Sequence, residues 1–402
     1  MVITMEKTAI QKFEMLTDAA CREKKIAGAA CMAADTEKII YEHAFGMADT
    51  ATGAPMTVDS VFAIASMTKP IVATACMQLV EQGLLDLDTD VGEYVSDFKN
   101  PLVLEGFDEN DTPILRPAKR AVTLRTLMSQ TSGVSHEGWD ARRLKWCRKF
   151  GIGPFGTEAR RVPLCFDPGE KWAYGLGIDW VMECMMAVTG KTLEQMLQEQ
   201  LFVPLGMSST SFHLSPEMAR RVVGLHIKNG DDPVISNTAL DRMMAGYGKW
   251  HDYGEGEGHG GLYSTARDYL RFLQMIISGG TFEGQQYLKP ETIKEMGSNQ
   301  IGDLYMHWEP ATRVGAYGID LDDFLGDGQK SKWGLGWLVN EKETALGRGA
   351  GGMCWFGGYD TYMWADPVGK LCGVAMMQHK TAATVDSMSV YYNFERMLHD
   401  KL

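Results

Sequence analysis

The sequence has no long apolar run and no segment typical of export. No stretch of about eighteen consecutive apolar residues occurs along the 402 residues, so no membrane-spanning helix is expected. Residues 1–8 lack a basic stretch followed by an apolar one, which argues against a cleaved secretory signal. We therefore expect a globular protein that works in the cytoplasm and has no membrane partner.

Positive charge is scarce. The 39 lysine and arginine residues are outnumbered by 52 aspartate and glutamate residues, and the net charge is −13. A protein with this charge is repelled by phosphate backbones and by anionic membranes. Nucleic-acid binding is therefore a poor hypothesis for this chain.

Motifs for disulfides and metals are also missing. The eight cysteines are scattered without a C-x-x-C pair, which is typical of buried thiols rather than of a disulfide framework or a zinc site. The nine histidines are dispersed, and neither H-E-x-x-H nor H-x-x-E-H occurs. We therefore expect no metal and no cofactor.

The two ends of the chain carry matching patterns. Each end combines a hairpin with a helix, and the expected elements are a helix over residues 7–24, strands over 28–34 and 39–45, strands over 360–365 and 371–378, and a helix over 384–398. Residues 66–207 between them show helical periodicity. We predict an α/β fold in which an antiparallel sheet built from both chain termini is flanked by helices, with an inserted, mainly helical subdomain.

The predicted boundaries place the α/β domain at residues 1–62 and 212–402 and the helical subdomain at 63–211, with the active site in the crevice between them. Four loop-rich stretches, residues 100–121, 135–168, 226–259 and 297–332, carry Trp139, Trp146, Trp250 and Trp308. These tryptophans are candidate walls of a substrate pocket, and surface loops pinned by aromatic side chains are an equally good interpretation.

Ser66 and Lys69 form the most informative short motif. Ser66 precedes a helical pattern over residues 71–80, so its hydroxyl is expected at a helix N-terminus, where backbone N–H groups favour developing negative charge. Lys69 lies one turn later on the same face. Its amine can accept the serine proton if desolvation or a neighbouring cation lowers its pKa. By itself, S-x-x-K also fits a helix cap with a solvated lysine.

Two later segments supply further candidate groups. Tyr174 follows the Pro168-Gly169 turn and precedes a helix, where a phenol beside a lysine is able to relay or accept a proton. A packed tyrosine is the alternative interpretation. Residues 351–361 are rich in glycine and enter a strand, a pattern that lets an edge N–H complete an oxyanion hole.

Together these segments resemble the serine β-lactamase-like superfamily, which includes class C β-lactamases, penicillin-binding D-Ala-D-Ala carboxypeptidases, family VIII carboxylesterases and related fungal acyltransferases. The resemblance covers nearly the whole chain and includes residues 41–49, 83–88, 123–133, 203–207 and 260–268. It implies the fold predicted above and an acyl-enzyme mechanism.

The resemblance also implies a role for each motif residue. Ser66 matches the family nucleophile, Lys69 its activating lysine and Tyr174 the tyrosine that opens the second motif. The oxyanion hole is then formed by the backbone N–H groups of Ser66 and Gly358. The third motif falls on residues 355–357, and Leu176 is the third residue of the second motif. The predicted substrate-binding residues are therefore Leu176, Trp355, Phe356 and Gly357.

Two of these positions depart from the β-lactamase pattern. Leu176 stands where β-lactamases carry an asparagine that hydrogen-bonds the substrate amide, and Trp355 stands where many of them carry a lysine or histidine that attracts a carboxylate. Leaving either polar group unpaired costs roughly 1–3 kcal/mol. The changes resemble those of the family VIII esterases and the fungal acyltransferases.

We therefore predict a serine ester hydrolase that forms an acyl-enzyme on Ser66 from a small-molecule ester with a short or medium acyl group. Water or an acceptor alcohol then resolves the acyl-enzyme. An acyltransferase of secondary metabolism, an amidase, a D-aminopeptidase and a weak β-lactamase stay open as alternatives. A non-catalytic binding or filament-forming module is the alternative from another class, and the intact Ser66, Lys69 and Tyr174 argue against it.

Overall fold

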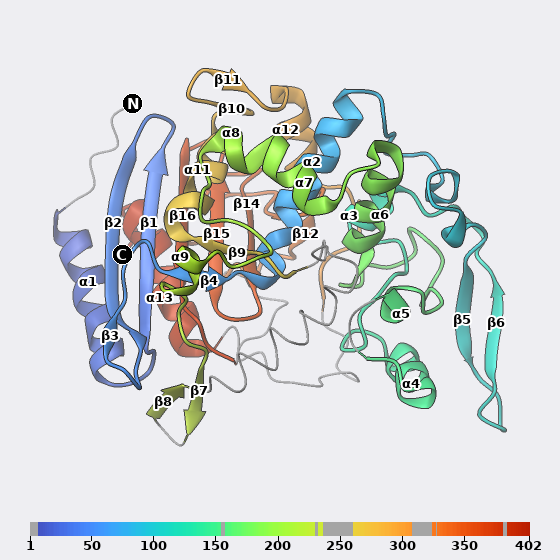
Figure 1. Cartoon of the computed structure of the whole chain (residues 1–402), viewed down its shortest axis with the longest axis horizontal. Coiled ribbons are helices and arrows are strands. Elements are labelled where there is room, and N and C mark those ends of the chain that lie inside the picture. The colour runs from blue at the N-terminus through green and yellow to red at the C-terminus, as the bar shows by residue number, and fades with distance from the viewer. Residues whose placement is uncertain are drawn as a thin grey trace.

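An eight-stranded antiparallel sheet built from both ends of the chain forms the centre of the fold (Figure 1). The structure, a computed structural model, describes residues 7–153, 157–229, 232–235, 260–307, 324–326, 328–380 and 384–402. The strands follow the order β12 (Lys332–Trp333), β13 (Leu338–Val339), β14 (Met353–Gly357), β15 (Thr361–Asp366), β16 (Leu371–Met376), β1 (Gly28–Asp35), β2 (Ile39–Asp49) and β3 (Ala54–Pro55). The predicted sheet is therefore confirmed.

The join between the two ends lies in the middle of this sheet. β1 pairs with β16 in a register that sets Ala30 opposite Met376 and Asp35 opposite Leu371. β15 and β16 are buried along their whole length, and so is nearly all of β1, because helices cover both faces. The N-terminal helix α1 (Lys7–Arg22) packs on the C-terminal helix α13 (Val385–Leu398), and α11 (Ala266–Ile277) packs on β1, β15 and β16.

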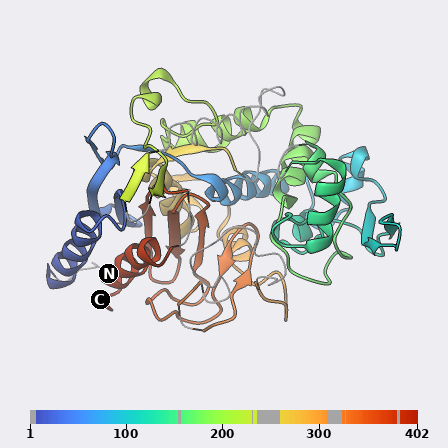
Figure 2. The ribbon, with the colours of Figure 1, turned by 90° about the horizontal axis from the view of Figure 1, so that it is seen from below.

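The helical part of the chain gathers beside one end of the sheet. Figure 2 shows its teal helices on one side of the molecule and its yellow-green helices across the top, with the blue α2 running between the sheet and the teal helices. α2 (Thr68–Glu81) and α6 (Gly177–Thr189) pack on each other and are buried nearly all round, as helices inside a core are. The other helices of this part are α3 (Leu124–Met128), α4 (Ala141–Phe150), α5 (Thr157–Arg160), α7 (Leu193–Leu197), the π-helical η4 (Gln198–Phe202) and α8 (Val203–Leu205). The predicted domain boundaries stay a prediction.

Two of the predicted loop-rich stretches were wrong in part. Residues 100–121 contain the hairpin β5 (Leu102–Phe107) and β6 (Pro113–Pro117), closed by a turn in which the Asp108 carboxylate accepts from the backbone N–H groups of Asn110 and Thr112. Residues 135–168 contain α4, which the Asp140 side chain caps at its N-terminus. Most of residues 226–259 and 308–323 lies outside the described part of the chain.

The remaining elements are short. They are the 3₁₀ turns η1 (Ala65–Met67), η2 (Val91–Glu93) and η3 (Ser96–Phe98), the helices α9 (Pro216–Ala219) and α12 (Pro290–Met296), and the strand pairs β4 (Val61–Ala63) with β9 (Tyr263–Thr265), β7 (His226–Asn229) with β8 (Asp232–Ile235), and β10 (Thr281–Phe282) with β11 (Gln285–Gln286). Within the described ranges, no helix is both long enough and apolar enough to cross a membrane.

Candidate active site

A short strand and one helical turn carry Ser66. β4 pairs with β9, and the chain then enters η1, which runs directly into α2. Ser66 is therefore half-buried at the N-terminal end of α2, where the sequence predicted it. Unpaired backbone N–H groups and the helix dipole favour negative charge at such a position.

Lys69 lies in the first turn of α2, directly beside the serine. Its side chain is 1% exposed, and its Nζ donates a hydrogen bond to Ser66 Oγ at 3.1 Å. The same Nζ lies 4.7 Å from the centre of the Tyr174 ring. The amine therefore contacts both of the other groups in the predicted motif and is shielded from bulk water.

Tyr174 reaches the serine from the segment that precedes α6. Its hydroxyl oxygen accepts a hydrogen bond from the indole Nε1 of Trp355 at 3.0 Å. Burial raises the pKa of this phenol above its ordinary value, whereas hydrogen bonds from the side chains of Ser66 and Trp355 favour the phenolate and oppose part of that rise. The phenol therefore stays protonated at neutral pH while remaining in hydrogen-bond contact with the serine.

Two glycines allow the Tyr174 segment to lie this close. A Cβ at Gly175 would come within 2.2 Å of the carbonyl oxygen of Val134, and one at Gly177 within 2.8 Å of that of Leu127. The N–H of Gly175 donates to Oε1 of the buried Gln130 at 2.9 Å. The segment therefore packs backbone against backbone, which fixes where the phenol points.

The end of β14 packs against the residues just before Ser66. A Cβ at Gly357 would come within 2.2 Å of the Ile64 carbonyl oxygen, so only glycine fits there. A Cβ at Gly358 would meet nothing within 4 Å, so this residue borders open space. Ser66 is the second residue of η1, and the first N–H groups of a helix have no partner within it.

The side chains predicted to bind substrate are mostly interior. Leu176 is 1% exposed and begins α6 inside the core, and Phe356 is 4% exposed and stacks on Phe324. Trp355 is 2% exposed, and its ring packs on Trp333 and Tyr174. Unlike these three side chains, Gly358, which was predicted for the oxyanion hole, borders free space.

The hydrogen bond from Trp355 to Tyr174 is the feature that sequence reasoning missed. The two residues are 181 positions apart, and the sequence analysis predicted Trp355 only as a substrate-binding residue in place of a cation. One signal was available, because an indole N–H is a donor without acceptor capacity and needs a partner when the ring is buried.

An aromatic cavity lies next to the phenol. It has a volume of about 420 Å³ and is lined by Trp139, Asp140, Phe166, Lys171, Trp172, Ala173 and His307. The rings of Trp139 and Trp172 lie 5.7 and 6.4 Å from that of Tyr174. Of the four predicted wall tryptophans, Trp139 lines this cavity and Trp146 packs on Phe150 instead. Trp250 and Trp308 lie outside the described residues.

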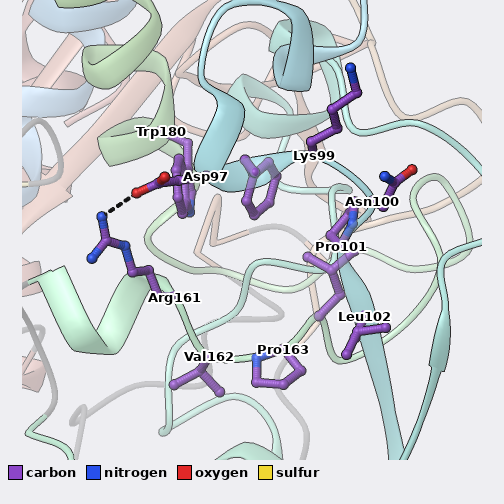
Figure 3. Close-up of a pocket in the computed structure, with 11 residues that line it drawn as sticks. Asp97, Lys99, Asn100, Pro101, Leu102, Arg161, Val162, Pro163 and Trp180 are labelled. Carbon is purple, nitrogen blue, oxygen red and sulfur yellow. Dashed lines mark hydrogen bonds and ion pairs between the residues drawn. The ribbon is translucent and has the colours of Figure 1, made fainter.

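A second cavity of about 420 Å³ lies at the base of the β5–β6 hairpin (Figure 3). Phe98 and Trp180 stack in its wall, with ring centres 4.2 Å apart. Asp97 and Arg161 form an ion pair across its edge. As in the first cavity, none of Ser66, Lys69 and Tyr174 is among the residues that line it.

The described residues contain no cluster of side chains suited to binding a metal ion. Across the described ranges, no group of three or more histidine, cysteine, aspartate and glutamate side chains is arranged to hold a metal ion.

Known proteins similar to this chain carry related names. Lovastatin esterase of Penicillium rubens is 30% identical over 371 residues, which cover 88% of this chain and 89% of the relative. Monacolin J acid methylbutanoyltransferase of Aspergillus terreus is 28% identical over 402 residues, which cover 94% of this chain and 90% of the relative. The first name describes an esterase, and the second describes the transfer of an acyl group.

Solved structures show the same fold. Unliganded simvastatin synthase (LovD) from Aspergillus terreus matches with a TM-score of 0.82 and 25% identity, covering 98% of each chain. EstCE1, described as a hydrolase with promiscuous acyltransferase activity, matches in fold with a TM-score of 0.73 and 19% identity, covering 98% of this chain and 99% of that one.

The family assignment rests on the length of the match. The sequence model of the beta-lactamase family covers residues 11–393, so it spans the sheet, the helical part and all three motifs. The resemblance predicted from the sequence is thereby confirmed, and this chain belongs to the beta-lactamase family.

Proposed function

We propose that this protein is a serine ester hydrolase and acyltransferase that forms an acyl-enzyme on Ser66. The observation that carries the proposal is the hydrogen bond of 3.1 Å between Lys69 Nζ and Ser66 Oγ, beside a Tyr174 phenol that Trp355 holds. A nucleophile within hydrogen-bond reach of a base, with a third group that orients the pair, is the arrangement that activates a hydroxyl.

The first half of the cycle acylates the serine. An unprotonated Lys69 amine accepts the Ser66 proton while Ser66 Oγ forms a bond to the ester carbonyl carbon, which gives a tetrahedral oxyanion. The bond to the alcohol oxygen then breaks, and the proton returns from Lys69 to that oxygen through the Tyr174 hydroxyl. The free alcohol leaves, and the acyl group stays on Ser66.

Tyr174 acts as a relay in this scheme. Because burial raises the pKa of the phenol, the hydroxyl enters the cycle protonated and can pass one proton on while it receives another. We therefore assign the first acceptance of the proton to Lys69 and its delivery to the leaving group to Tyr174.

The oxyanion is stabilised by two backbone donors. We assign this role to the N–H groups of Ser66 and Gly358, since the first lies at the start of α2 and the second borders open space at the end of β14. Donors that are already in place, in a site from which water is excluded, contribute roughly 3–4 kcal/mol each to transition-state stabilisation.

The preferred substrate is a neutral ester. The Trp355 N–H donates to Tyr174, and Leu176 is buried and apolar, so neither provides an anchor for a substrate carboxylate or amide. The cavity lined by Trp139, Phe166 and Trp172 provides aromatic surface for the apolar part of the ester.

The second half of the cycle transfers the acyl group. Water or an acceptor alcohol gives a proton to Lys69 through Tyr174 and attacks the acyl-enzyme carbonyl. The bond between the acyl carbon and Ser66 Oγ then breaks, the proton returns from Lys69 to Ser66 Oγ, and an acid or a new ester leaves. The names of the relatives cover both outcomes, since one is an esterase and another a methylbutanoyltransferase. We therefore expect the ratio of ester to acid to rise when a small alcohol is added to the assay.

One comparison of substrates separates this proposal from a β-lactamase. We expect p-nitrophenyl butyrate to be turned over, whereas a chromogenic cephalosporin lacks two polar partners and should show a kcat/KM lower by about a hundredfold or more. The two values are measured on one enzyme preparation in one buffer. A cephalosporin value equal to or above the ester value would reject the esterase assignment.

A covalent probe separates an enzyme from a non-catalytic binding module. A fluorophosphonate should label Ser66, which mass spectrometry of the digested protein identifies. The absence of labelling at Ser66 would favour the binding module.

A further inference from the structure

The backbone that carries Ser66 is bent at the residue before it. Ala65 has φ of +43°, in the left-handed region that residues with a Cβ adopt only at an energetic cost. Such a conformation persists when surrounding contacts hold it, and strain of this kind is often found at functional sites. The contacts that hold the chain on either side of Ala65 therefore decide whether this conformation persists.

Gln378 holds the chain on the N-terminal side of the bend. It follows β16 and is 1% exposed. Its Oε1 accepts from the N–H of Ala63 at 2.9 Å, and its Nε2 donates to the Ala63 carbonyl oxygen at 3.4 Å. One side chain thus pairs with both the N–H and the carbonyl group of Ala63, and it fixes the position of β4 relative to the large sheet.

Tyr269 holds the chain on the C-terminal side. It lies on α11, is fully buried, and donates its hydroxyl proton to the Met67 carbonyl oxygen at 2.8 Å. Burial raises the pKa of this phenol well above its ordinary value, so it remains a donor throughout the physiological range. Gln378 and Tyr269 thus reach the two sides of Ser66 from different elements.

We propose that Gln378 and Tyr269 are positioning residues for Ser66. They hold Ala63 and Met67, which flank the strained turn. The turn then keeps Ser66 Oγ within hydrogen-bond distance of Lys69 Nζ and leaves the Ser66 N–H free to bind an oxyanion. Neither is assigned a contact with substrate, and both act through backbone groups. The inference rests on the proposed function only in taking Ser66 as the nucleophile.

The expected effect is on reactivity rather than on substrate binding. Displacing a reacting atom by about 1 Å can cost about a hundredfold in rate, so losing one of several holding contacts is expected to cost about tenfold. KM should stay within about twofold, because the walls of the substrate site are unchanged.

The test uses two variants that remove these bonds and keep the packing volume, Tyr269→Phe and Gln378→Met. The readouts are the rate of fluorophosphonate labelling at Ser66 and kcat for p-nitrophenyl butyrate per labelled site. Counting only labelled sites removes the contribution of unfolded protein. We expect both rates to fall about tenfold in each variant.

A matched control comes from the same helix as Tyr269. Gln274 is 7% exposed, and its Nε2 donates to the Asp35 carbonyl oxygen at 2.9 Å, at the end of β1. Gln274→Met therefore removes a buried bond from a side chain to the backbone without touching the Ser66 turn. We expect this variant to lose thermal stability and to keep both rates per site within about twofold of the wild type.

A further variant tests whether strain at Ala65 explains the loss of reactivity at Ser66. Ala65→Gly accepts the positive φ without cost, so in the Tyr269→Phe background it should restore part of the lost labelling rate. The loss in the double variant should then be smaller than the product of the two single losses.

Labelling at Ser66 and ester turnover together separate a failure of the positioning roles from a failure of the proposed function. Labelling rates of Tyr269→Phe and Gln378→Met equal to that of Gln274→Met would overturn the positioning roles. A wild-type protein that is labelled at Ser66 but turns over no ester would reject the proposed function, and the labelling rates would still decide the positioning roles. A wild-type protein without labelling at Ser66 would overturn both.

Discussion

Two cavities of equal volume, about 420 Å³ each, lie in very different chemical settings. The first shares aromatic walls with Tyr174, whose hydroxyl is bonded to Trp355 and whose ring lies over Lys69. The second, beneath the β5–β6 hairpin, has a stacked Phe98–Trp180 pair and an exposed ion pair of the kind that contributes little (Figure 3). Size and aromatic lining alone therefore do not identify an active site, and we base the assignment on the contact between the proposed base Lys69 and the proposed nucleophile Ser66.

The largest expected effect comes from removing the hydroxyl of Ser66, the proposed nucleophile. Ser66→Ala should leave the fold intact, because alanine is smaller than serine, and should reduce ester turnover to below about one per cent of wild type. The measurement is kcat for p-nitrophenyl butyrate, with circular dichroism as the control for folding. A variant that keeps more activity would move the chemistry away from Ser66 and open the second cavity to consideration.

The next effect concerns the two groups that move the proton. Lys69→Ala and Tyr174→Phe should each lower kcat by at least about a hundredfold, and the double variant should lose much less than the product of the single losses. Such non-additivity is expected of groups that act as a unit. Multiplicative losses would instead mean that Lys69 and Tyr174 work independently, and a fully active Tyr174→Phe would assign the proton transfer to Lys69 alone.

Trp355→Phe should have an intermediate effect, because it removes one donor and keeps an aromatic ring. We expect kcat to fall about tenfold. The hydrogen bond from Trp355 favours the phenolate and so lowers the pKa of Tyr174, whereas burial raises it. Losing this hydrogen bond should therefore raise the pKa of Tyr174 further. An ultraviolet difference titration should therefore show Tyr174 ionising at no lower pH in Trp355→Phe than in the wild type. Ionisation at a lower pH would contradict the assigned role.

The smallest expected effect is on substrate binding, and it should differ between the two cavities. Trp139→Leu and Phe98→Leu each shorten a buried aromatic side chain, one in each cavity, and should cost similar stability. We expect Trp139→Leu to raise KM for an ester with a bulky apolar acyl group by about fivefold, and Phe98→Leu to leave KM within about twofold. Equal changes in KM would mean that the cavity beside Tyr174 does not bind the ester.

The sheet could be predicted from the sequence because its strands have clear local signals. The runs at residues 28–34 and 371–378 are apolar and bounded by turns, and the structure pairs them as β1 and β16. The helix α4 had no such signal, since its sequence is rich in arginine and lysine and buries only Arg143 and Cys147. In a polar helix with so few buried residues, the hydrophobic period is too weak to detect.

The site could be predicted residue by residue but not contact by contact. Ser66 and Lys69 are close in sequence, so helix geometry alone brings them together. The bond between Trp355 and Tyr174 depends on how β14 and the segment before α6 pack, and no local pattern encodes this. The burial of Leu176 likewise follows from the close packing of Gly175 and Gly177 on neighbouring backbone.

The pairing of β1 with β16 has a consequence for biosynthesis. Ala30 emerges from the ribosome long before its partner Met376, and at about 5–20 residues per second the interval is roughly 20–70 s. During that interval the apolar strand β1 has β2 on one edge and nothing on the other, which makes it a target for chaperones or for aggregation. The nascent chain therefore cannot close its central sheet, or complete the surroundings of Ser66, until its last strand has been synthesised.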